Sequence, residues 1–436
     1  MADLETSVRA IALAARKASA ALARTTTDQR NAALFAMARA LREHSAAIVK
    51  ANAEDMKAGR SAGMSEGLLD RLELNEQRVE SMARALEDLA SLPDPVGRVL
   101  EERTIEGGML LQRISVPLGV VAMVYEARPN VTADAAGICL KAGNACVLRG
   151  GSQALHSNIA LTNVLRDAVR AAGLPADSIC SIETADRAAT DVLMGLHGLV
   201  DVLIPRGGAG LIRHCVEHSK VPVIETGTGN CHVYVHESAD FDIARAIVMN
   251  AKTQRTGVCN ACESLLVDEA AAKAFLPRML SELADAGAVV HGDSLARECA
   301  ALAEEGGSAN VLEHFVDAVE ADWGTEYLAL EISVKTVGGV EEAIEHINRY
   351  GTGHSECIIA STSSEDGKNA ADAFAAGVDA AAVYVNVSTR FTDGACFGLG
   401  AEIGISTQKL HVRGPFALEA LTSYKYVVRG EGQVRG

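Results

Sequence analysis

The first hundred residues carry apolar side chains at every third or fourth position, the spacing of helices that bury one face. The segments NAALFAMARALREHSAAIVKAN and RVESMARALEDLASL show this spacing clearly. TTTDQ, which stands before the former segment, supplies side chains that can cap a helix. LPDPVG, at 92–97, ends the pattern because its two prolines cannot continue a helix. The pattern therefore predicts helices throughout 1–95.

Beyond about residue 115 short apolar runs alternate with amphipathic segments. The strands predicted in a first block are VPLGVVAMVYEA, ACVLR, SICSIE, LVDVLIP and VPVIE. A second block begins near 231, with the strands CHVYVH, ESLLVD, AVVHG, LALEISVKTV, ECIIAS and AAVYVNV. This alternation predicts two α/β units, each with a parallel sheet covered on both faces. The tail, EALTSYKYVVRG, predicts a further exposed strand of the kind that pairs with a partner chain.

Length, charge and cysteine content narrow the class of protein. The chain has 436 residues, enough for two domains of ordinary size. Its formal net charge of −17 argues against a nucleic-acid partner, because a phosphate backbone needs a basic face. The ten cysteines stand singly apart from one pair, as in a reduced intracellular protein. Since no apolar run approaches the ~20 residues that span a bilayer and the N-terminus lacks a signal-peptide block, we expect a cytoplasmic protein with no membrane segment.

The segment LIPRGGAGLIRHC joins an apolar run to an amphipathic one through Gly207, Gly208 and Gly210. Bare backbone at the start of a helix offers N–H groups and the positive end of the helix dipole to a pyrophosphate. The spacing does not match the G-x-G-x-x-G fingerprint. A tight turn that binds nothing is therefore an equal alternative.

Two arginines stand where predicted strands end, at the sheet edge where open α/β folds bind ligands. Arg149 can reach a ribose or a 2′-phosphate with its planar charged fork, although a surface arginine is the commoner case. Arg128 precedes Asn130. Asn130 can cap the following helix or equally donate its amide N–H to an oxyanion, and on these residues alone the cap, as the commoner role, is the prediction.

KTQRTGVCNACESLLV contains Cys259 and Cys262. A dithiol couple is expected at the start of a helix, whereas a predicted strand follows here. Half of a zinc site needs partners, and no second cysteine pair accompanies the scattered histidines, so we predict no metal site. The remaining interpretation is one reactive thiol at Cys259, whose thiolate Lys252 and Arg255 can stabilise. Cys262 would then be a small buried residue.

The string Q-R-x-G-V-C-N-A around Cys259 resembles the catalytic-cysteine motif of the aldehyde dehydrogenase superfamily. Longer matching strings extend the resemblance over nearly the whole chain; among them are VPLGVVAMVYEARPNVTADAAGICLKAGNACVLRGG, ETGTGNCHVYV, YVNVSTRFTDGACFGLGAEIGISTQKLHVRGP and EALTSYKY. The resemblance implies an aldehyde-dehydrogenase-like α/β fold, with two parallel-sheet domains and a small oligomerisation element. The implied boundaries are 1–102 and 114–228 for an NADPH-binding domain, 229–412 for a catalytic domain, and 103–113 and 413–436 for the oligomerisation element.

The resemblance also implies an activity. The expected reaction is NADPH-dependent reduction of gamma-glutamyl phosphate (L-glutamate 5-phosphate) to L-glutamate 5-semialdehyde with release of phosphate, in proline biosynthesis. Cys259 matches the nucleophile, which would form a thioacyl intermediate. Asn130 matches the asparagine whose amide, with the backbone N–H of Cys259, holds the oxyanion. Glu225 stands where related dehydrogenases keep a general base, although this direction of reaction does not obviously need one.

Further roles follow position by position. Arg149 stands where the superfamily usually has a lysine that contacts the adenosine ribose. The pyrophosphate turn falls at Gly207, Gly208 and Gly210. Glu326 is similar to the glutamate that holds the nicotinamide ribose, but EYLALEISVK replaces the usual Phe-Gly-Pro after it.

The substrate loop of the superfamily falls at NVSTRF, 386–391. Ser388 and Thr389 can bind the α-carboxylate of the substrate through hydroxyl and backbone donors, and Arg390 or Arg128 can add charge. A structural salt bridge is an equal alternative for each arginine. The resemblance further implies a homo-oligomer, and a glutamate kinase that hands over the acyl phosphate is a conceivable partner.

Two other functions stay open on the sequence. One is an aldehyde dehydrogenase of the same fold that acts on another small semialdehyde. The other is a redox or zinc protein that uses Cys259 and Cys262 together. Dependence of activity on phosphate would separate the first from the expected reaction, and metal analysis would test the second.

Overall fold

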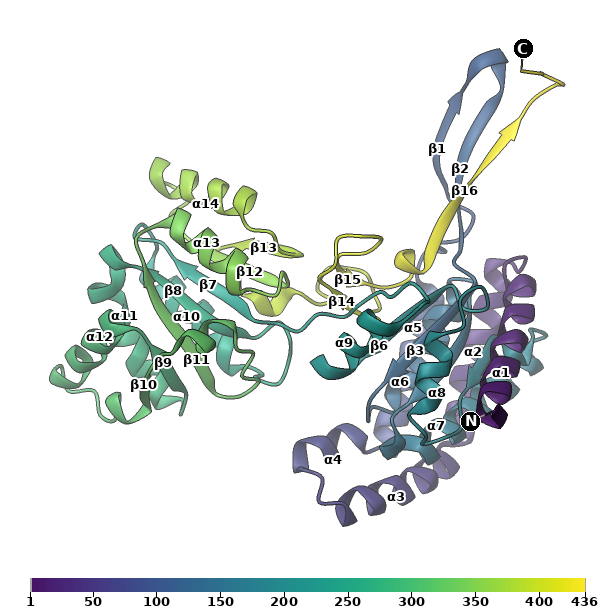
Figure 1. The fold of residues 1–436 in the computed structure, drawn as a ribbon, viewed down its shortest axis with the longest axis horizontal. Coiled ribbons are helices and arrows are strands. Elements are labelled where there is room, and N and C mark those ends of the chain that lie inside the picture. Colours follow the sequence, from purple (N-terminus) through teal and green to yellow (C-terminus); the bar gives the residue numbers. More distant parts are fainter. Residues whose placement is uncertain (1, 436) are drawn as a thin grey trace. The chain divides into compact units, whose positions relative to one another are not determined.

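The computed structural model describes residues 2–435, and these fold into two compact units (Figure 1). Unit 1 comprises 2–226, 398–404 and 416–435 of the described residues, and unit 2 comprises 227–397 and 405–415. The prediction of two α/β units is therefore confirmed. Among the residues that the structure describes, no helix combines the length and apolarity that a bilayer crossing requires.

Unit 1 begins with a block of helices, as the apolar spacing predicted. They are α1 (Ala2–Leu22), α2 (Thr27–Glu43), α3 (Ser45–Ser61), α4 (Glu66–Leu72) and α5 (Glu76–Ser91). The predicted cap before α2 is a capping box: the Thr26 hydroxyl accepts from the Gln29 N–H, and the Gln29 side chain accepts from the Thr26 N–H at 2.9 Å. These helices bury one face each against the rest of unit 1.

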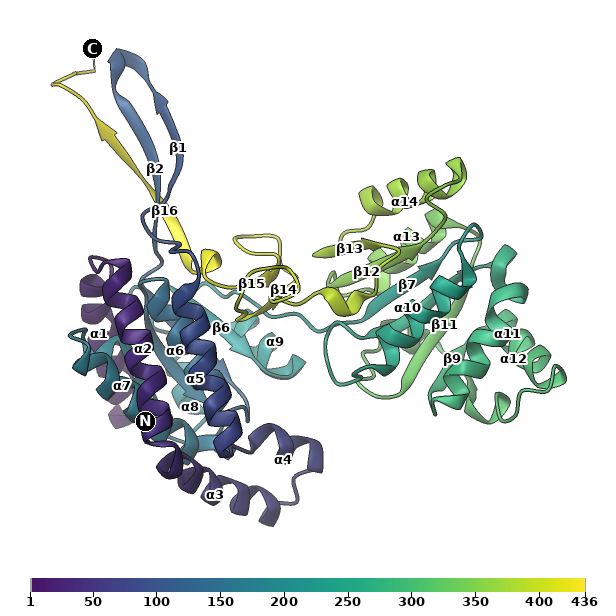
Figure 2. The same ribbon diagram turned by 180° about the vertical axis from the view of Figure 1, so that it is seen from behind.

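The main sheet of unit 1 is parallel, with strand order β5-β4-β3-β6. Its strands are β3 (Val120–Tyr125), β4 (Ala145–Gly150), β5 (Ile179–Ser181) and β6 (Val202–Arg206). The helices between them are α6 (Asn130–Lys141), α7 (Leu155–Ala171), α8 (Ala188–Met194) and α9 (Ala209–His218). α1 packs on the sheet with α8, whereas α6 and α7 pack with α2 and α5 (Figure 2). The predicted strand VPVIE is wrong, because Val223 makes only an isolated bridge to Leu203.

A second sheet in unit 1 is antiparallel and joins segments far apart in the chain. Its strands are β1 (Val99–Thr104), β2 (Leu110–Pro117) and β16 (Thr422–Arg429), in the order β1-β2-β16. Both views show this ribbon standing clear of the helices of its unit. The tail therefore forms the strand that its sequence predicted.

Unit 2 is built on a seven-stranded parallel sheet with the order β10-β9-β11-β8-β7-β12-β13. Its strands are β7 (Cys231–Val235), β8 (Cys262–Asp268), β9 (Val289–Gly292), β10 (Phe315–Asp317), β11 (Glu331–Val337), β12 (Ser355–Ile359) and β13 (Ala382–Val385). One apolar core lies under α10 (Phe241–Thr253), α11 (Glu269–Asp285) and α12 (Ser294–Glu305). A second core lies under α13 (Val340–Tyr350) and α14 (Glu365–Gly377).

Short elements complete the chain. The strands are β14 (Gly404–Ser406) and β15 (Gly414–Phe416), and the 3₁₀ turns are η1 (Glu106–Gly108), η2 (Ser152–Ala154), η3 (Ala176–Ser178), η4 (Leu312–His314), η5 (Glu320–Gly324), η6 (Thr389–Phe391) and η7 (Glu419–Leu421). Of these, η6 contains the predicted residues Thr389 and Arg390, and η5 ends two residues before Glu326.

Candidate active site

Cys259 lies in the loop between α10 and β8, and its residue is half-buried. The loop is bonded to the first residue of β7, because the thiol of Cys231 donates to the carbonyl oxygen of Cys259 at 3.1 Å. Gly229, just before β7, packs directly on the same peptide. A Cβ added to Gly229 would overlap the Cys259 carbonyl, so only glycine permits this approach. The backbone of Cys259 is thus fixed, while its side chain remains partly accessible.

Asn260 ties the cysteine loop to the predicted substrate loop. Its side-chain amide donates to the carbonyl of Thr392 at 2.9 Å and to that of Arg390 at 3.3 Å. In return, the hydroxyl of Thr389 donates to the Asn260 carbonyl at 2.8 Å. Thr389 is fully buried, so its hydroxyl is committed to the loop and is not offered to a ligand. The structure therefore brings the cysteine loop and residues 389–392 together within unit 2.

Arg390 brings positive charge to this loop. Its Nε donates to Gln254 at 3.0 Å, and the hydroxyl of Ser388 accepts from its backbone N–H at 3.3 Å. Burial first, and the neighbouring charge of Arg255 second, lower the pKa of Arg390, while Cys259 acts in the opposite sense. Because an arginine stays charged at any physiological pH, two guanidinium groups and Cys259 share one electrostatic environment.

Glu326 joins the same group of residues from the segment after η5. Its Oε1 accepts from the backbone N–H of Gly229 at 2.6 Å. Burial raises the pKa of Glu326, and the hydrogen bond from Gly229 opposes that rise. Because Gly229 also packs on the Cys259 peptide, Gly229 connects the Glu326 carboxylate to the cysteine loop.

The predicted residues of unit 1 lie where its parallel strands end. Gly207, Gly208 and Gly210 follow β6 and open α9, and all three are exposed. Glu126, which follows the adjacent β3, accepts from the Gly208 N–H at 3.1 Å. A Cβ on Gly207 would come within 2.6 Å of the Glu126 carboxyl carbon, whereas one on Gly210 would meet open space. The turn therefore exposes bare backbone, and the Glu126 carboxylate already accepts one of its N–H groups.

Arg149 is the second-last residue of β4, and only 6% of it is exposed. It is therefore not a surface arginine, the alternative that its position after a strand had left open. Its guanidinium donates to the carbonyls of Gly150 at 2.8 Å and Asp186 at 3.1 Å. Its Nε is buried and has no hydrogen-bond partner among the described residues. Burial, followed by the like charge of Arg187, lowers the pKa of Arg149. Arg149 thus fastens the end of β4 to the turn at 185–186.

Asn130 and Arg128 follow β3 and are both exposed. The predicted cap at Asn130 is wrong: Pro129 occupies the N-cap position of α6 and Asn130 is the first helical residue. Its amide instead donates to Asp134 at 3.1 Å. Glu225 is half-buried and lies near the end of the long segment of unit 1.

Three comparisons with known proteins bear on this arrangement. The model of the aldehyde dehydrogenase family matches residues 2–329. The chain belongs to the aldehyde dehydrogenase family. Gamma-glutamyl phosphate reductase of Moorella thermoacetica is 54% identical over 97% of both chains, and that of Thermobifida fusca is 51% identical over 100% of both. A crystal structure of gamma-glutamyl phosphate reductase from Thermotoga maritima superimposes with a TM-score of 0.93, at 44% identity, and covers 98% of this chain and 100% of that one.

Membership of the aldehyde dehydrogenase family confirms the expected fold class. It also implies an oxidoreductase that uses a nicotinamide cofactor and acts on a small molecule. The unit 1 sheet edge and the Cys259 loop are the parts of this family member that offer, respectively, bare backbone for an anion and an accessible thiol.

Cys262 has the buried environment that the sequence suggested for it. It is the first residue of β8, is fully buried, and donates its thiol to the Ser264 carbonyl at 3.3 Å. Burial raises the pKa of Cys262 to about 12. A thiol that stays protonated at neutral pH is a poor nucleophile, so the two cysteines of the motif are chemically unlike.

Lys252, which was expected to stabilise the Cys259 thiolate, is paired with a carboxylate. Its ammonium is fully buried and lies 2.6 Å from Glu263, which the sequence did not single out. Glu126, Asp134, Asn260 and Gly229 were also missed. Asp134 contacts Asn130 one turn away on α6, whereas the other three contact predicted residues or their peptides across the fold, where no local sequence pattern marks the contact.

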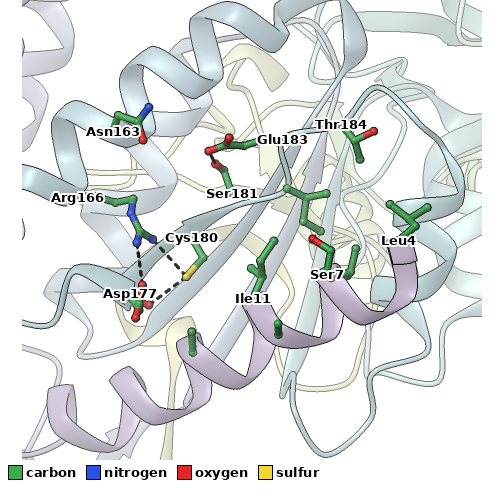
Figure 3. Close-up of a pocket in the computed structure, with 14 residues that line it drawn as sticks. Leu4, Ser7, Ile11, Asn163, Arg166, Asp177, Cys180, Ser181, Glu183 and Thr184 are labelled. Carbon is green, nitrogen blue, oxygen red and sulfur yellow. Dashed lines mark hydrogen bonds and ion pairs between the residues drawn. The ribbon is translucent and has the colours of Figure 1, made fainter. Parts of the chain in front are cut away.

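A cavity of about 560 Å³ in unit 1 lies between α1 and the segment after β5, and none of the predicted site residues lines it (Figure 3). Arg166, which lines it, points at Asp177 and donates to it at 2.8 Å. Its charge is therefore already neutralised by the protein.

Proposed function

We propose that this chain reduces gamma-glutamyl phosphate to glutamate 5-semialdehyde with NADPH and releases inorganic phosphate, as a step of proline biosynthesis. The observation that carries the proposal is the half-buried thiol of Cys259 on a loop fixed by Gly229 and Asn260, in a chain about half identical to gamma-glutamyl phosphate reductases along its whole length. A free thiol nucleophile suits the reducing cytoplasm, where we place the reaction.

In this proposal the Cys259 thiolate attacks the carbonyl carbon of the acyl phosphate. A carbon–sulfur bond forms, the carbon–oxygen bond to phosphate breaks, and phosphate leaves with the electron pair. The oxyanion of the tetrahedral intermediate accepts hydrogen bonds from the Cys259 backbone N–H and the Asn130 amide. The positive charge of Arg390, which interacts with Cys259, would favour the thiolate over the thiol, and we propose that Arg255 adds to this effect. We assign Glu225 no role in the reductive direction and propose it only as a general base for the reverse, oxidative direction.

The residues of unit 1 fit a dinucleotide. Gly207, Gly208 and Gly210 leave the start of α9 without side chains, which suits a pyrophosphate. The buried Nε of Arg149 has no acceptor within 2–435, and a ribose or its 2′-phosphate would supply one. Glu326 would hold the nicotinamide ribose. When bound, NADPH supplies the hydride that takes the thioester to the aldehyde.

For the amino-acid end of the substrate we propose Ser388, the backbone of Thr389, and the charges of Arg390 and Arg128. The Thr389 hydroxyl has no part in this, since Asn260 already accepts its hydrogen. Together these groups would select a small substrate with an α-carboxylate.

We also propose that unit 1 carries the cofactor, that unit 2 carries the catalytic thiol, and that the sheet β1-β2-β16 pairs copies of the chain. Tyr424 and Tyr426 of β16 are about half exposed, which suits a face that another copy covers. A glutamate kinase would supply the unstable acyl phosphate.

The test follows NADPH formation in the reverse direction, from glutamate 5-semialdehyde and NADP⁺. The proposal expects turnover that requires inorganic phosphate and stops in a Cys259→Ser variant. Equal turnover in phosphate-free buffer would instead identify a hydrolytic aldehyde dehydrogenase. Isothermal titration with NADP⁺ and NAD⁺ measures the cofactor preference separately.

A further inference from the structure

Lys252 and Glu263 close the base of the loop that carries Cys259. The loop joins α10 to β8, which Figure 1 labels. Lys252 is the second-last residue of α10, and Glu263 is the second residue of β8, so the pair spans both ends of the loop. The Lys252 Nζ lies 2.6 Å from the Glu263 Oε2, and both side chains are completely buried. The two ends of the cysteine loop are thus joined by a single ion pair inside the protein.

The second oxygen of Glu263 reaches a different segment. Its Oε1 accepts from the backbone N–H of Leu328 at 3.3 Å. Two residues earlier, Glu326 accepts from Gly229, and Gly229 packs on the Cys259 peptide. Glu263 therefore links the cysteine loop to the segment that carries Glu326.

The stability of the fold alone does not explain why a buried ion pair stands here in place of two apolar side chains. Removing two charges from water costs several kcal/mol per ion, and well-packed apolar side chains of similar size are often as stable or more so. Burial raises the pKa of Glu263 to about 7 even though Lys252 opposes the rise, which reflects that cost. The carboxylate of Glu263 accepts a hydrogen bond from Lys252 with one oxygen and from the Leu328 N–H with the other. An apolar side chain at this position could make neither bond.

We propose that the Lys252–Glu263 pair is a positioning element, which holds the Cys259 loop and the Glu326 segment in the one arrangement that catalysis needs. Neither side chain touches the substrate. The role rests on the proposed function in that it takes Cys259 as the nucleophile. A displacement of ~1 Å at a reacting group can cost ~10²-fold in rate, so a small relaxation of the loop would be visible in kcat.

The test uses three variants of the full chain. Glu263→Gln keeps the shape but has one acceptor oxygen for two donors. Lys252→Met removes the charge, and the double variant Lys252→Met with Glu263→Met replaces the whole pair by apolar side chains. Lys335→Met is the matched control, because its Lys–Glu pair, with Glu342, is partly exposed on the same unit.

Three quantities are measured for each variant: the melting temperature, kcat and KM for NADP⁺-dependent oxidation, and the rate at which iodoacetamide alkylates the Cys259 peptide, followed by mass spectrometry. We expect the double variant to melt near the wild type, yet to lose about 10-fold or more in kcat with KM changed by less, together with an altered alkylation rate. The control should match the wild type in all three.

If the double variant keeps wild-type kcat and alkylation rate, the pair is structural only and the proposal fails. If it fails to fold, Glu263→Gln decides between the same two outcomes. Alkylation of Cys259 does not depend on the substrate. An enzyme inactive toward glutamate 5-semialdehyde would refute the proposed function, while the alkylation rates would still decide the positioning role.

Discussion

The side-chain amide of Asn130 donates a hydrogen bond of 3.1 Å to the carboxylate of Asp134, one turn further along α6. Burial raises the pKa of Asp134 to about 6, and the hydrogen bond from Asn130 opposes that rise. The amide proposed to hold the oxyanion is therefore aimed by a second residue of its own helix. A hydrogen-bond donor that is oriented before the substrate arrives is worth more than one that must turn toward it.

Asn130→Ala should lower kcat by about 10²–10³-fold with a small change in KM, because one oxyanion donor is lost. The measurement is steady-state NADPH formation at saturating phosphate. Asn163→Ala, an exposed asparagine on α7 of the same unit, is the control and should leave kcat unchanged. Loss of activity in both variants would point to a general folding effect.

The raised pKa of Asp134 makes a signed prediction about stability. Its contribution is fully present below pH 3.8, the unperturbed value, and is lost as the pH rises through about 6. Asp134→Asn stays neutral and can still accept from Asn130. Between pH 4 and 7 the wild type should therefore lose stability relative to this variant, on the order of 1 kcal/mol. Urea unfolding at several pH values measures it; a constant difference would contradict it.

The two cysteines of the motif should behave differently. Cys259→Ser removes the proposed nucleophile and should abolish turnover in the phosphate-dependent assay. Cys262→Ser keeps a small donor able to bond to the Ser264 carbonyl, so kcat should stay within about twofold of the wild type. Equal inactivation of both variants, with folding intact by circular dichroism, would revive the two-cysteine hypotheses.

Gly229→Ala should impair the loop of Cys259, since the added methyl group overlaps the Cys259 carbonyl. The backbone has to shift, and we expect a loss of about 10²-fold in kcat or more. Gly338→Ala is the control in the same unit, because its Cβ would meet Glu342 at an ordinary 3.4 Å. An active Gly229→Ala enzyme would show that the close approach is dispensable.

The exposed tyrosines of β16 test the pairing of copies. Tyr424→Asp together with Tyr426→Asp places two charges on a face that is about half exposed within one chain. If another copy covers that face, burying unpaired charges would be costly, and the mass in solution should fall by light scattering. An unchanged mass would place the contact between copies elsewhere.

Elements with a clear period were predictable from sequence, and contacts between distant segments were not. The capping side chains before α2 stand within one turn of each other, so TTTDQ was enough to predict them. The helices α11 and α12, which span 269–305, were not among the predicted elements. Arg149 looked like a surface residue because the carbonyl of Asp186, which buries it, lies 37 positions away.

The candidate site divides in the same way. Cys259 could be predicted because its neighbours in sequence form a family motif. The partners of the loop could not, because a lysine and a glutamate eleven positions apart, Lys252 and Glu263, look like two solvated charges until both are buried. Gly229 gave no signal either, since its requirement for glycine arises from the Cys259 peptide, in the loop that leads into the neighbouring strand β8.

The pairing of β16 with β2 sets an order of events during synthesis on the ribosome. Arg429 bonds to Gln112, 317 positions earlier, and all of unit 2 lies between the two strands in the sequence. At about 5–20 residues per second, the edge of β2 waits roughly 15–60 s for its partner, long enough for unit 2 to fold first. During that interval the nascent chain exposes an unpaired strand edge, the kind of surface that invites aggregation. Chaperone demand should therefore peak late in translation and end when β16 emerges.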